Sequence, residues 1–88
     1  MTLPKRLVFL GRLEDLAGGP SQDIAKAGPL PWNDLLATLA ERHSQALVDA
    51  VQADKVRIAV NGVVIADKTA LVLADGDEIA FLPPVSGG

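Results

Sequence analysis

The sequence contains no cysteine and no tyrosine, and its only aromatic residues are one tryptophan and two phenylalanines. Without cysteine the chain has no disulfides, no thiolate metal ligands and no thiol nucleophile. Any sulfur chemistry must therefore use a group other than a side-chain thiol. With so few aromatic residues, a core must be built mainly from Leu, Val, Ile and Ala.

The chain also lacks an excess of positive charge and any long apolar run. Its 8 basic and 11 acidic residues give a net charge of −3, which speaks against a nucleic-acid partner. The apolar run at 7–10 is too short for a signal peptide or a membrane span. We therefore expect a cytoplasmic protein that binds neither nucleic acid nor membrane.

Few residues are suited to metal binding or to side-chain catalysis. His43 is the only histidine of the 88 residues, so it has no second histidine or cysteine for a metal site, and we assign it no serine or cysteine partner for a catalytic triad. Asp75, Asp77 and Glu78 lack the spacing of a calcium-binding loop and fit a charged turn instead. We expect no metal and no bound cofactor. Several cations are predicted to be solvated, namely Lys5, Arg6, Arg12, Arg57 and Lys68.

Local patterns predict one small domain with strands around a main helix. The predicted strands cover 6–10, 21–27, 56–60, 63–65 and 78–82, and Asn61-Gly62 predicts a hairpin between two of them. A helical turn is predicted at 12–17 and a further helical piece after Ser44. The main helix begins at Trp32, since Trp32, Leu35, Leu36, Leu39 and Ala40 form one apolar stripe. This order predicts an α+β fold, in which a mixed sheet of four or five strands packs on one main helix.

Strand alternation leaves apolar side chains on the sheet face that points away from the helix, here called the outer face. The side chains predicted to point inward are Leu7, Phe9, Val63, Ile65, Ile79 and Phe81. Those predicted on the outer face are Val8, Leu10, Val64, Ala80 and Leu82. This set is either ordinary apolar surface or a partner-binding patch. We favour the patch, which requires the first and last strands to pair so that Leu10 and Leu82 become neighbours.

The residues after the predicted domain (1–82) form a narrow flexible tail at 83–88. Gly87 and Gly88 have no Cβ atoms, so a narrow enzyme cleft can admit them and act on the last carbonyl carbon. Pro83-Pro84 favours an extended exit, and the tail spans roughly 20 Å at about 3.3–3.6 Å per residue. Ser86 has no base nearby in the sequence and is expected to supply a hydrogen bond. The alternative is a merely frayed end.

The segment 75–88, Asp-Gly-Asp-Glu-Ile-Ala-Phe-Leu-Pro-Pro-Val-Ser-Gly-Gly, closely resembles the C-terminus of the small subunits of molybdopterin synthase. These form a family of ubiquitin-like sulfur carriers with the β-grasp fold. The resemblance extends to Val60-Asn61 and to the pattern Arg12-x-Glu14-x-x-Ala17-Gly18. It departs at Gly11, where Ala is common, at Leu10 and Leu82, where aromatics are common, and in the longer segments 18–31 and 66–74.

The resemblance implies a non-catalytic subunit in molybdenum cofactor biosynthesis. An E1-like partner adenylates the Gly88 carboxylate with ATP, and sulfur transfer makes it a thiocarboxylate. The tail then enters the large synthase subunit, in a heterotetramer, and its sulfur attacks cyclic pyranopterin monophosphate to build the dithiolene. The residues that the resemblance and the outer-face pattern assign to partner contact are Leu10, Val64, Leu82, Pro83, Pro84, Val85 and Ser86, with Gly87 beside the reacting Gly88.

Three other functions are compatible with a Gly-Gly end. The chain could carry sulfur for another pathway, such as thiamine thiazole synthesis, although those tails usually lack Pro-Pro-Val-Ser. It could be a ubiquitin-like modifier whose Gly88 forms isopeptide bonds with lysines. It could also be a plain interaction domain.

Overall fold

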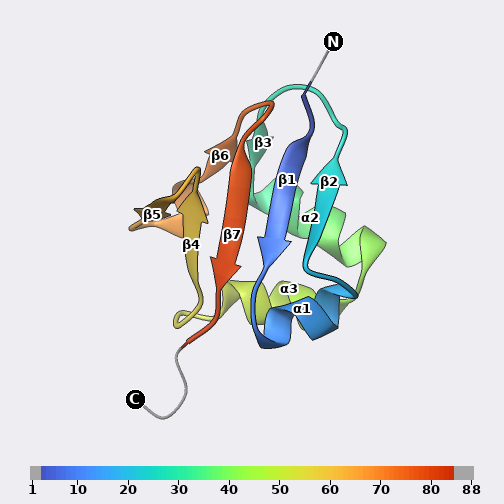
Figure 1. Ribbon diagram of the computed structural model, residues 1–88, viewed down its shortest axis with the longest axis vertical. Coiled ribbons are helices and arrows are strands. Elements are labelled where there is room, and N and C mark those ends of the chain that lie inside the picture. Colours follow the sequence, from blue (N-terminus) through green and yellow to red (C-terminus); the bar gives the residue numbers. More distant parts are fainter. Residues whose placement is uncertain (1–2, 85–88) are drawn as a thin grey trace.

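A computed structural model describes residues 3–84, which form a five-stranded mixed sheet with helices packed on one face (Figure 1). The elements are β1 (Lys5–Phe9), α1 (Arg12–Ala17), β2 (Ser21–Ile24), β3 (Leu30–Pro31), α2 (Trp32–Arg42), α3 (Gln45–Gln52), β4 (Arg57–Val60), β5 (Val63–Ile65), the 3₁₀ helix η1 (Lys68–Ala70), β6 (Val72–Leu73) and β7 (Glu78–Leu82). The predicted α+β fold is confirmed.

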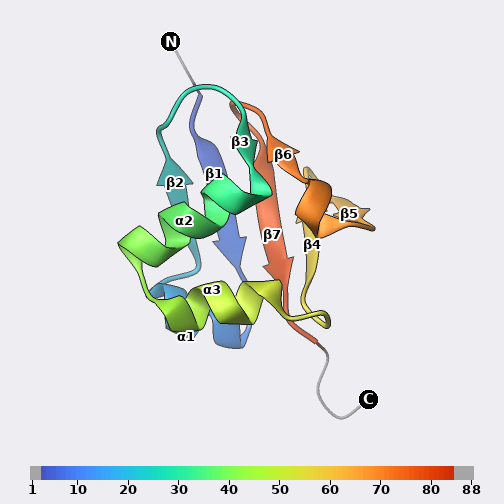
Figure 2. The same cartoon turned by 180° about the vertical axis from the view of Figure 1, so that it is seen from behind.

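The last strand lies in the middle of the sheet, whose order is β2-β1-β7-β4-β5. β1 and β7 pair, as the outer-face argument required. This pair is parallel, and the other neighbouring strands are antiparallel. Helices α2 and α3 cross one face of this sheet and leave the other uncovered (Figure 2). β7 ends at Leu82, the residue predicted to end the domain.

Helix α2 supplies the centre of the helical layer. Trp32, Leu35 and Leu39 are buried against the sheet, as their spacing predicts. Leu36 packs at the edge of this core, but Ala40 is exposed, which corrects its assignment to the stripe. Each helical residue turns the chain by about 100°, so Ala40 lies beyond the edge of the face that Leu39 occupies.

Helix α3 begins where the sequence predicts a second helical piece. The hydroxyl of Ser44 caps it by accepting a hydrogen bond from the amide of Leu47 at 3.3 Å. Leu47, Val48 and Val51 are buried on the side that faces the sheet. The capping serine and the apolar spacing therefore both predict a helix that begins after Ser44.

Strand alternation fills the inner face of the sheet as predicted, with one exception. Phe9 and Phe81 are both fully buried and stack with ring centroids 5.1 Å apart. Ile65 packs against the core, but Val63, also predicted inside, is 64% exposed. β5 is a short edge strand, and Val63 starts it at the hairpin, so this side chain has a neighbouring strand on one side only.

The two segments that look longer than usual in the sequence contact each other. Leu30 pairs with Leu73, and Pro31 with Val72, in a separate two-stranded sheet of β3 and β6. The amide of Trp32 donates to the carbonyl of Leu71 at 2.9 Å, which joins the start of α2 to this sheet. These strands escaped prediction because two residues are too few to show an alternating pattern.

Lys5 corrects the expectation of a solvated charge, because its side chain is fully buried. Its ammonium donates to the Asp75 carboxylate at 2.8 Å and to the carbonyl of Lys26 at 2.7 Å. The same Asp75 oxygen accepts from the amide of Gly28 at 3.0 Å. Lys5 thus ties β1 to the turn before β7 and to the β2–β3 connection. Its partners lie 70 and 21 positions away, beyond any local pattern.

The turn at Asp75-Gly76-Asp77 is held by its own carboxylates. Asp77 accepts from the amide of Ala74 at 2.8 Å and from the side chain of Asn61 at 2.9 Å. These bonds hold the pKa of Asp77 below its ordinary value, against the opposing effect of burial. The hydrogen bond from Lys5 likewise lowers the pKa of Asp75 against the opposing effect of burial, and the Gly28 amide and the charge of Lys5 assist it.

These lowered pKa values predict that acid destabilises the fold through this turn. A carboxyl whose pKa is lower in the folded chain stabilises it above the unfolded value of about 3.9, and that stabilisation is lost as the pH falls through the folded value. Asp75→Asn and Asp77→Asn keep an acceptor oxygen but cannot ionise. We expect urea midpoints that change less than those of the original chain between about pH 7 and about pH 3.

The control for this experiment is Glu41→Gln, which removes one exposed carboxylate of α2 away from the turn. Its pH dependence should follow that of the original chain. An unchanged acid response in both turn variants would show that these carboxylates do not couple to folding.

Candidate functional site

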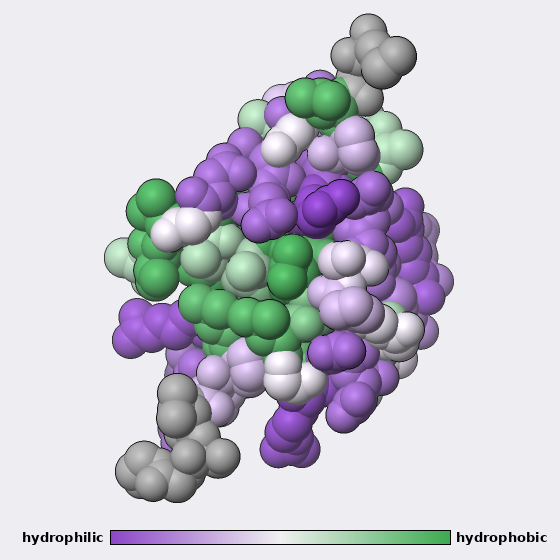
Figure 3. Space-filling view, viewed as in Figure 1, coloured by the Kyte–Doolittle hydropathy of each residue, from purple (hydrophilic) through white to green (hydrophobic). Residues whose placement is uncertain are grey.

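The outer face carries a continuous row of apolar side chains across four strands. The strand register places Val8, Ala80, Ala59 and Val64 side by side, from β1 through β7 and β4 to β5. Figure 3 shows the resulting apolar surface in the middle of the uncovered sheet face. Val64 is 55% exposed, and the other three are half-buried. Because alanine side chains are smaller than valine side chains, the surface is lower at the centre of the row than at its two ends.

This row continues toward the point where the tail leaves the sheet. Leu82 lies two residues beyond Ala80 on the same strand face, opposite Arg57 of β4. Leu10 follows directly after the Phe9–Phe81 pair, so it reaches the level of Leu82, and it is exposed. The structure thus brings the predicted residues to one end of the outer face. Their role in binding a partner is still a prediction.

Sequence reasoning missed Ala59 and did not connect Arg57 with this face. The signal was available in the segment Arg57-Ile58-Ala59, where a buried Ile58 alternates with two outward residues. Its strand neighbours were needed to show that Ala59 lies between Ala80 and Val64. Arg57, predicted to be solvated, is exposed and gives the lower end of the face a positive charge.

The root of the tail rests against the loop that joins β1 to α1. Gly11 has a φ of 56°, and a Cβ atom added there would lie 3.0 Å from Cγ of Pro83. Glycine therefore serves two needs here, a left-handed backbone and close approach of Pro83. Pro83 is half-buried and Pro84 is exposed. This contact fixes where the tail begins.

Gly11→Ala is expected to lower the free energy of unfolding by about 1–3 kcal/mol, because it forces a side chain into strained backbone geometry. It should also shift Pro83, which a change in the amide NMR signals of Leu82 will report. Gly19→Ala is the matched control, since a Cβ there meets nothing within 4 Å. Equal urea midpoints for the two variants would contradict this account of Gly11.

The reacting end of the predicted site, Val85, Ser86, Gly87 and Gly88, lies outside the described residues. The flexibility assigned to the tail and the roles of these four residues are therefore still predictions. The structure contributes the position and surroundings of Pro83-Pro84, from which the tail departs.

No set of side chains suited to a metal ion occurs among residues 3–84. His43, predicted to lie on the surface, is half-buried at the end of α2, with Nε2 2.8 Å from the side-chain oxygen of Gln22. Its ring meets Phe9 edge-on at 6.4 Å between centroids. In the described part of the chain, no helix is both long enough and apolar enough to cross a bilayer. A cytoplasmic location is still a prediction.

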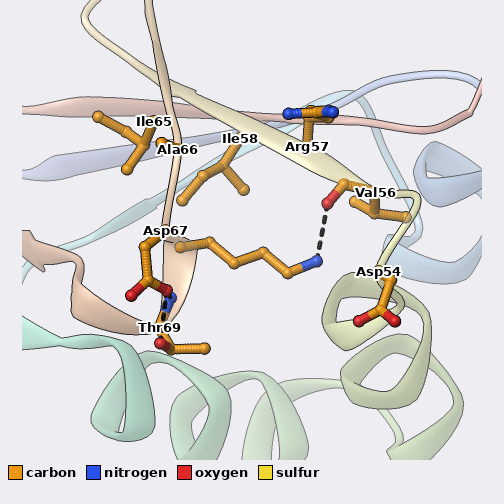
Figure 4. A pocket seen from close by; sticks show the side chains of 9 residues that line it. Asp54, Val56, Arg57, Ile58, Ile65, Ala66, Asp67 and Thr69 are labelled. Atoms are coloured by element: carbon orange, nitrogen blue, oxygen red, sulfur yellow. Dashed lines mark hydrogen bonds between the residues drawn. The ribbon is translucent and has the colours of Figure 1, made fainter.

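A cavity of about 350 Å³ between β4, β5 and η1 contains Lys68 (Figure 4). Predicted to be solvated, its ammonium instead donates to the carbonyls of Val51, Ala53 and Val56 at 3.0, 2.6 and 2.7 Å. Burial lowers the pKa of Lys68, and the nearby Asp54 opposes this. Because all three protons are engaged, Lys68 closes the end of α3 and offers neither a base nor a nucleophile.

These features define a class of protein. A mixed sheet with parallel central first and last strands, helices on one face and a tail beyond the last strand is a ubiquitin-like β-grasp domain. The ThiS family model matches residues 7–88, and the chain belongs to this family. The family resemblance found in the sequence is thus confirmed.

Individual relatives agree with this assignment. The chain is 37% identical over 87 residues to the molybdopterin synthase sulfur carrier subunit of Aedes aegypti, covering 93% of this chain and 86% of the relative. It matches a chain in the complex of subunits 1 and 2 of molybdopterin-converting factor from Helicobacter pylori with a TM-score of 0.63 and 30% identity, covering 98% and 100%. Small archaeal modifier protein 1 from Methanosarcina acetivorans matches with a TM-score of 0.74 and 25% identity, covering 100% and 99%.

Proposed function

We propose that this chain is the sulfur-carrier subunit of a molybdopterin synthase and contributes its C-terminal Gly88 rather than a catalytic side chain. The observation that carries this proposal is the similarity to a molybdopterin synthase sulfur carrier subunit over 93% of the chain. The family match also runs through Gly87-Gly88, the residues that the chemistry requires.

The proposed chemistry begins with a poor electrophile. The Gly88 carboxylate attacks the α-phosphate of ATP on a partner enzyme, pyrophosphate leaves, and an acyl adenylate forms. A sulfur donor at the oxidation level of sulfide then displaces AMP from the acyl carbon, which leaves a thiocarboxylate and free AMP. This soft anionic nucleophile attacks the pyranopterin precursor, and hydrolysis returns the Gly88 carboxylate. Each carrier delivers one sulfur, so the dithiolene requires two deliveries.

The described residues suit a subunit that is held by a partner. The outer face offers an apolar row that ends beside the root of the tail, so one partner can cover the row and receive the tail together. A related chain occurs in a complex of subunits 1 and 2 of molybdopterin-converting factor. We therefore propose a large synthase subunit as the partner, in a heterotetramer, and a separate E1-like enzyme that charges the tail.

A second candidate function is protein modification through Gly88. It is favoured by the similarity to small archaeal modifier protein 1, which covers the whole chain at 25% identity. In this case the acyl adenylate would be passed to a lysine amine, forming an isopeptide bond in place of a thiocarboxylate. A sulfur carrier for thiamine thiazole synthesis would form the same thiocarboxylate but deliver it elsewhere.

Intact-mass analysis of the protein purified from its own host separates these functions. Replacement of one C-terminal oxygen by sulfur supports a carrier, and lysine-linked conjugates support a modifier. The thiocarboxylated protein is then mixed with the large synthase subunit and the pyranopterin precursor. Formation of molybdopterin is the expected result, and failure to form it would overturn the proposed pathway.

A further inference from the structure

A second apolar surface lies on the helix side of the tail root. It is a groove of about 620 Å³ between α1, the end of α3 and the exit of the tail. Leu16, Ala50 and Ala53 contribute its apolar wall, and Pro84 forms the side next to the tail. Leu16 is 41% exposed, so a partner that covers the groove can bury it. The outer face does not account for this surface, because α3 lies behind the sheet and α1 lies beyond the end of β1 (Figures 1 and 2).

The charge of the groove differs from that of the whole chain. Acidic residues outnumber basic ones by 11 to 8 in the sequence. The charged residues among the described lining of the groove are Arg12 and Lys55, and no carboxylate accompanies them there. Neither cation forms an ion pair with another residue between 3 and 84. The groove is therefore apolar at its wall and positive at its rim.

Three occupants are conceivable, namely the chain's own last residues, a second copy and a different protein. The segment 85–88 would bury one valine and gain one exposed ion pair, which do not offset the conformational entropy of four ordered residues. A second copy brings the same net charge of −3 and the same positive groove, so the two rims would repel each other. A different protein with an apolar side chain flanked by carboxylates complements both the wall and the rim.

We propose that this groove docks an acidic segment with an apolar side chain that belongs to the enzyme that activates the tail. This inference rests on the proposed function, which requires such an enzyme. The groove adjoins Pro84, so a segment seated there holds the tail root from the helix side while the carboxylate reaches the ATP. The activating enzyme must bind and release a carrier in every turnover, and charges at a rim accelerate such encounters.

The test measures pyrophosphate release by the purified activating enzyme with ATP and the full chain as substrate. Leu16→Glu and Lys55→Glu are each expected to lower kcat/KM by about tenfold, because each places a negative charge against the acidic segment. Raising the salt concentration should lower kcat/KM for the original chain and have less effect on Lys55→Glu. Thermal unfolding verifies that Leu16→Glu is folded, and Lys55 is exposed.

The controls make the same chemical changes elsewhere. Val72→Glu places a charge on the exposed side of β6, and Lys26→Glu reverses an exposed cation of the β2–β3 connection. Both should leave kcat/KM within about twofold of the original chain. Binding of Leu16→Glu and Lys55→Glu to the large synthase subunit should likewise be unchanged.

Two results would overturn the inference. One is unaltered activation of both groove variants, and the other is an equal loss of activation and of large-subunit binding. Either result differs from failure of the proposed function, in which the original chain itself supports no pyrophosphate release.

Discussion

Deletion of Gly88 is expected to abolish sulfur transfer and leave the fold unchanged. Shortening the tail by one residue moves its end by about 3.4 Å, while a misplacement of 1 Å at a reacting centre can cost about 100-fold in rate. We therefore expect molybdopterin formation to fall by at least about 100-fold in the reconstituted synthase. Adding one residue after Gly88 should have the same effect, because the reacting carboxylate is then displaced.

The matched control for this deletion is Ser86→Ala, which keeps the length of the tail and removes only a hydroxyl. It should retain molybdopterin formation to within about tenfold, since it removes at most the one hydrogen bond expected of Ser86 and leaves the reacting carboxylate in place. Urea midpoints of all three variants should equal that of the original chain. Sulfur transfer by the shortened chain at the original rate would show that Gly88 is not the reacting residue.

Leu82→Glu is expected to weaken binding of the large synthase subunit by about 30-fold, which corresponds to about 2 kcal/mol. The reason is that an apolar partner surface would have to bury an uncompensated carboxylate at the end of the outer face. Isothermal titration calorimetry with the purified large subunit measures this change. The C-terminal residues of the variant stay chemically normal, so its tail can still be charged and verified by mass.

Val72→Glu is the control for this substitution. It introduces the same group at an apolar residue that is 55% exposed but belongs to β6, outside the five-stranded sheet. Its affinity for the large subunit should equal that of the original chain. If Leu82→Glu and Val72→Glu bind equally well, the outer face is not the docking surface.

Much of the fold could be predicted because local chemistry and tertiary packing agree. The turn at Asn61-Gly62 has positive φ at both residues, as a two-residue hairpin requires. The alternation of Phe9 and Phe81 with outward neighbours gave the correct face for each residue. What escaped prediction depends on distant partners. Lys5 and Lys68 look like surface cations until the carbonyls and carboxylate that surround them are in place.

The candidate site could likewise be predicted only in part. The outer-face residues could be found from the sequence, because strand alternation is a local signal, and glycine and proline predict the tail in the same way. The groove could not, since it combines Leu16 of α1 with Ala53 beyond α3 and with Pro84. Nothing in the sequence around Leu16 distinguishes an apolar residue that faces a groove from one that completes the core.

Because β7 lies in the middle of the sheet, folding of the domain depends on synthesis of its last strand. β1, the first strand to be synthesised, cannot join β4 until β7 is inserted between them. The sheet therefore closes only after nearly the whole chain has left the ribosome. A prematurely ended chain lacks the middle of its sheet and is left to proteolysis, whereas every chain that has folded already carries the root of its tail. Folding itself thus rejects chains that end before β7, whereas a chain that lacks only its last residue still folds and fails later, at the chemistry of Gly88.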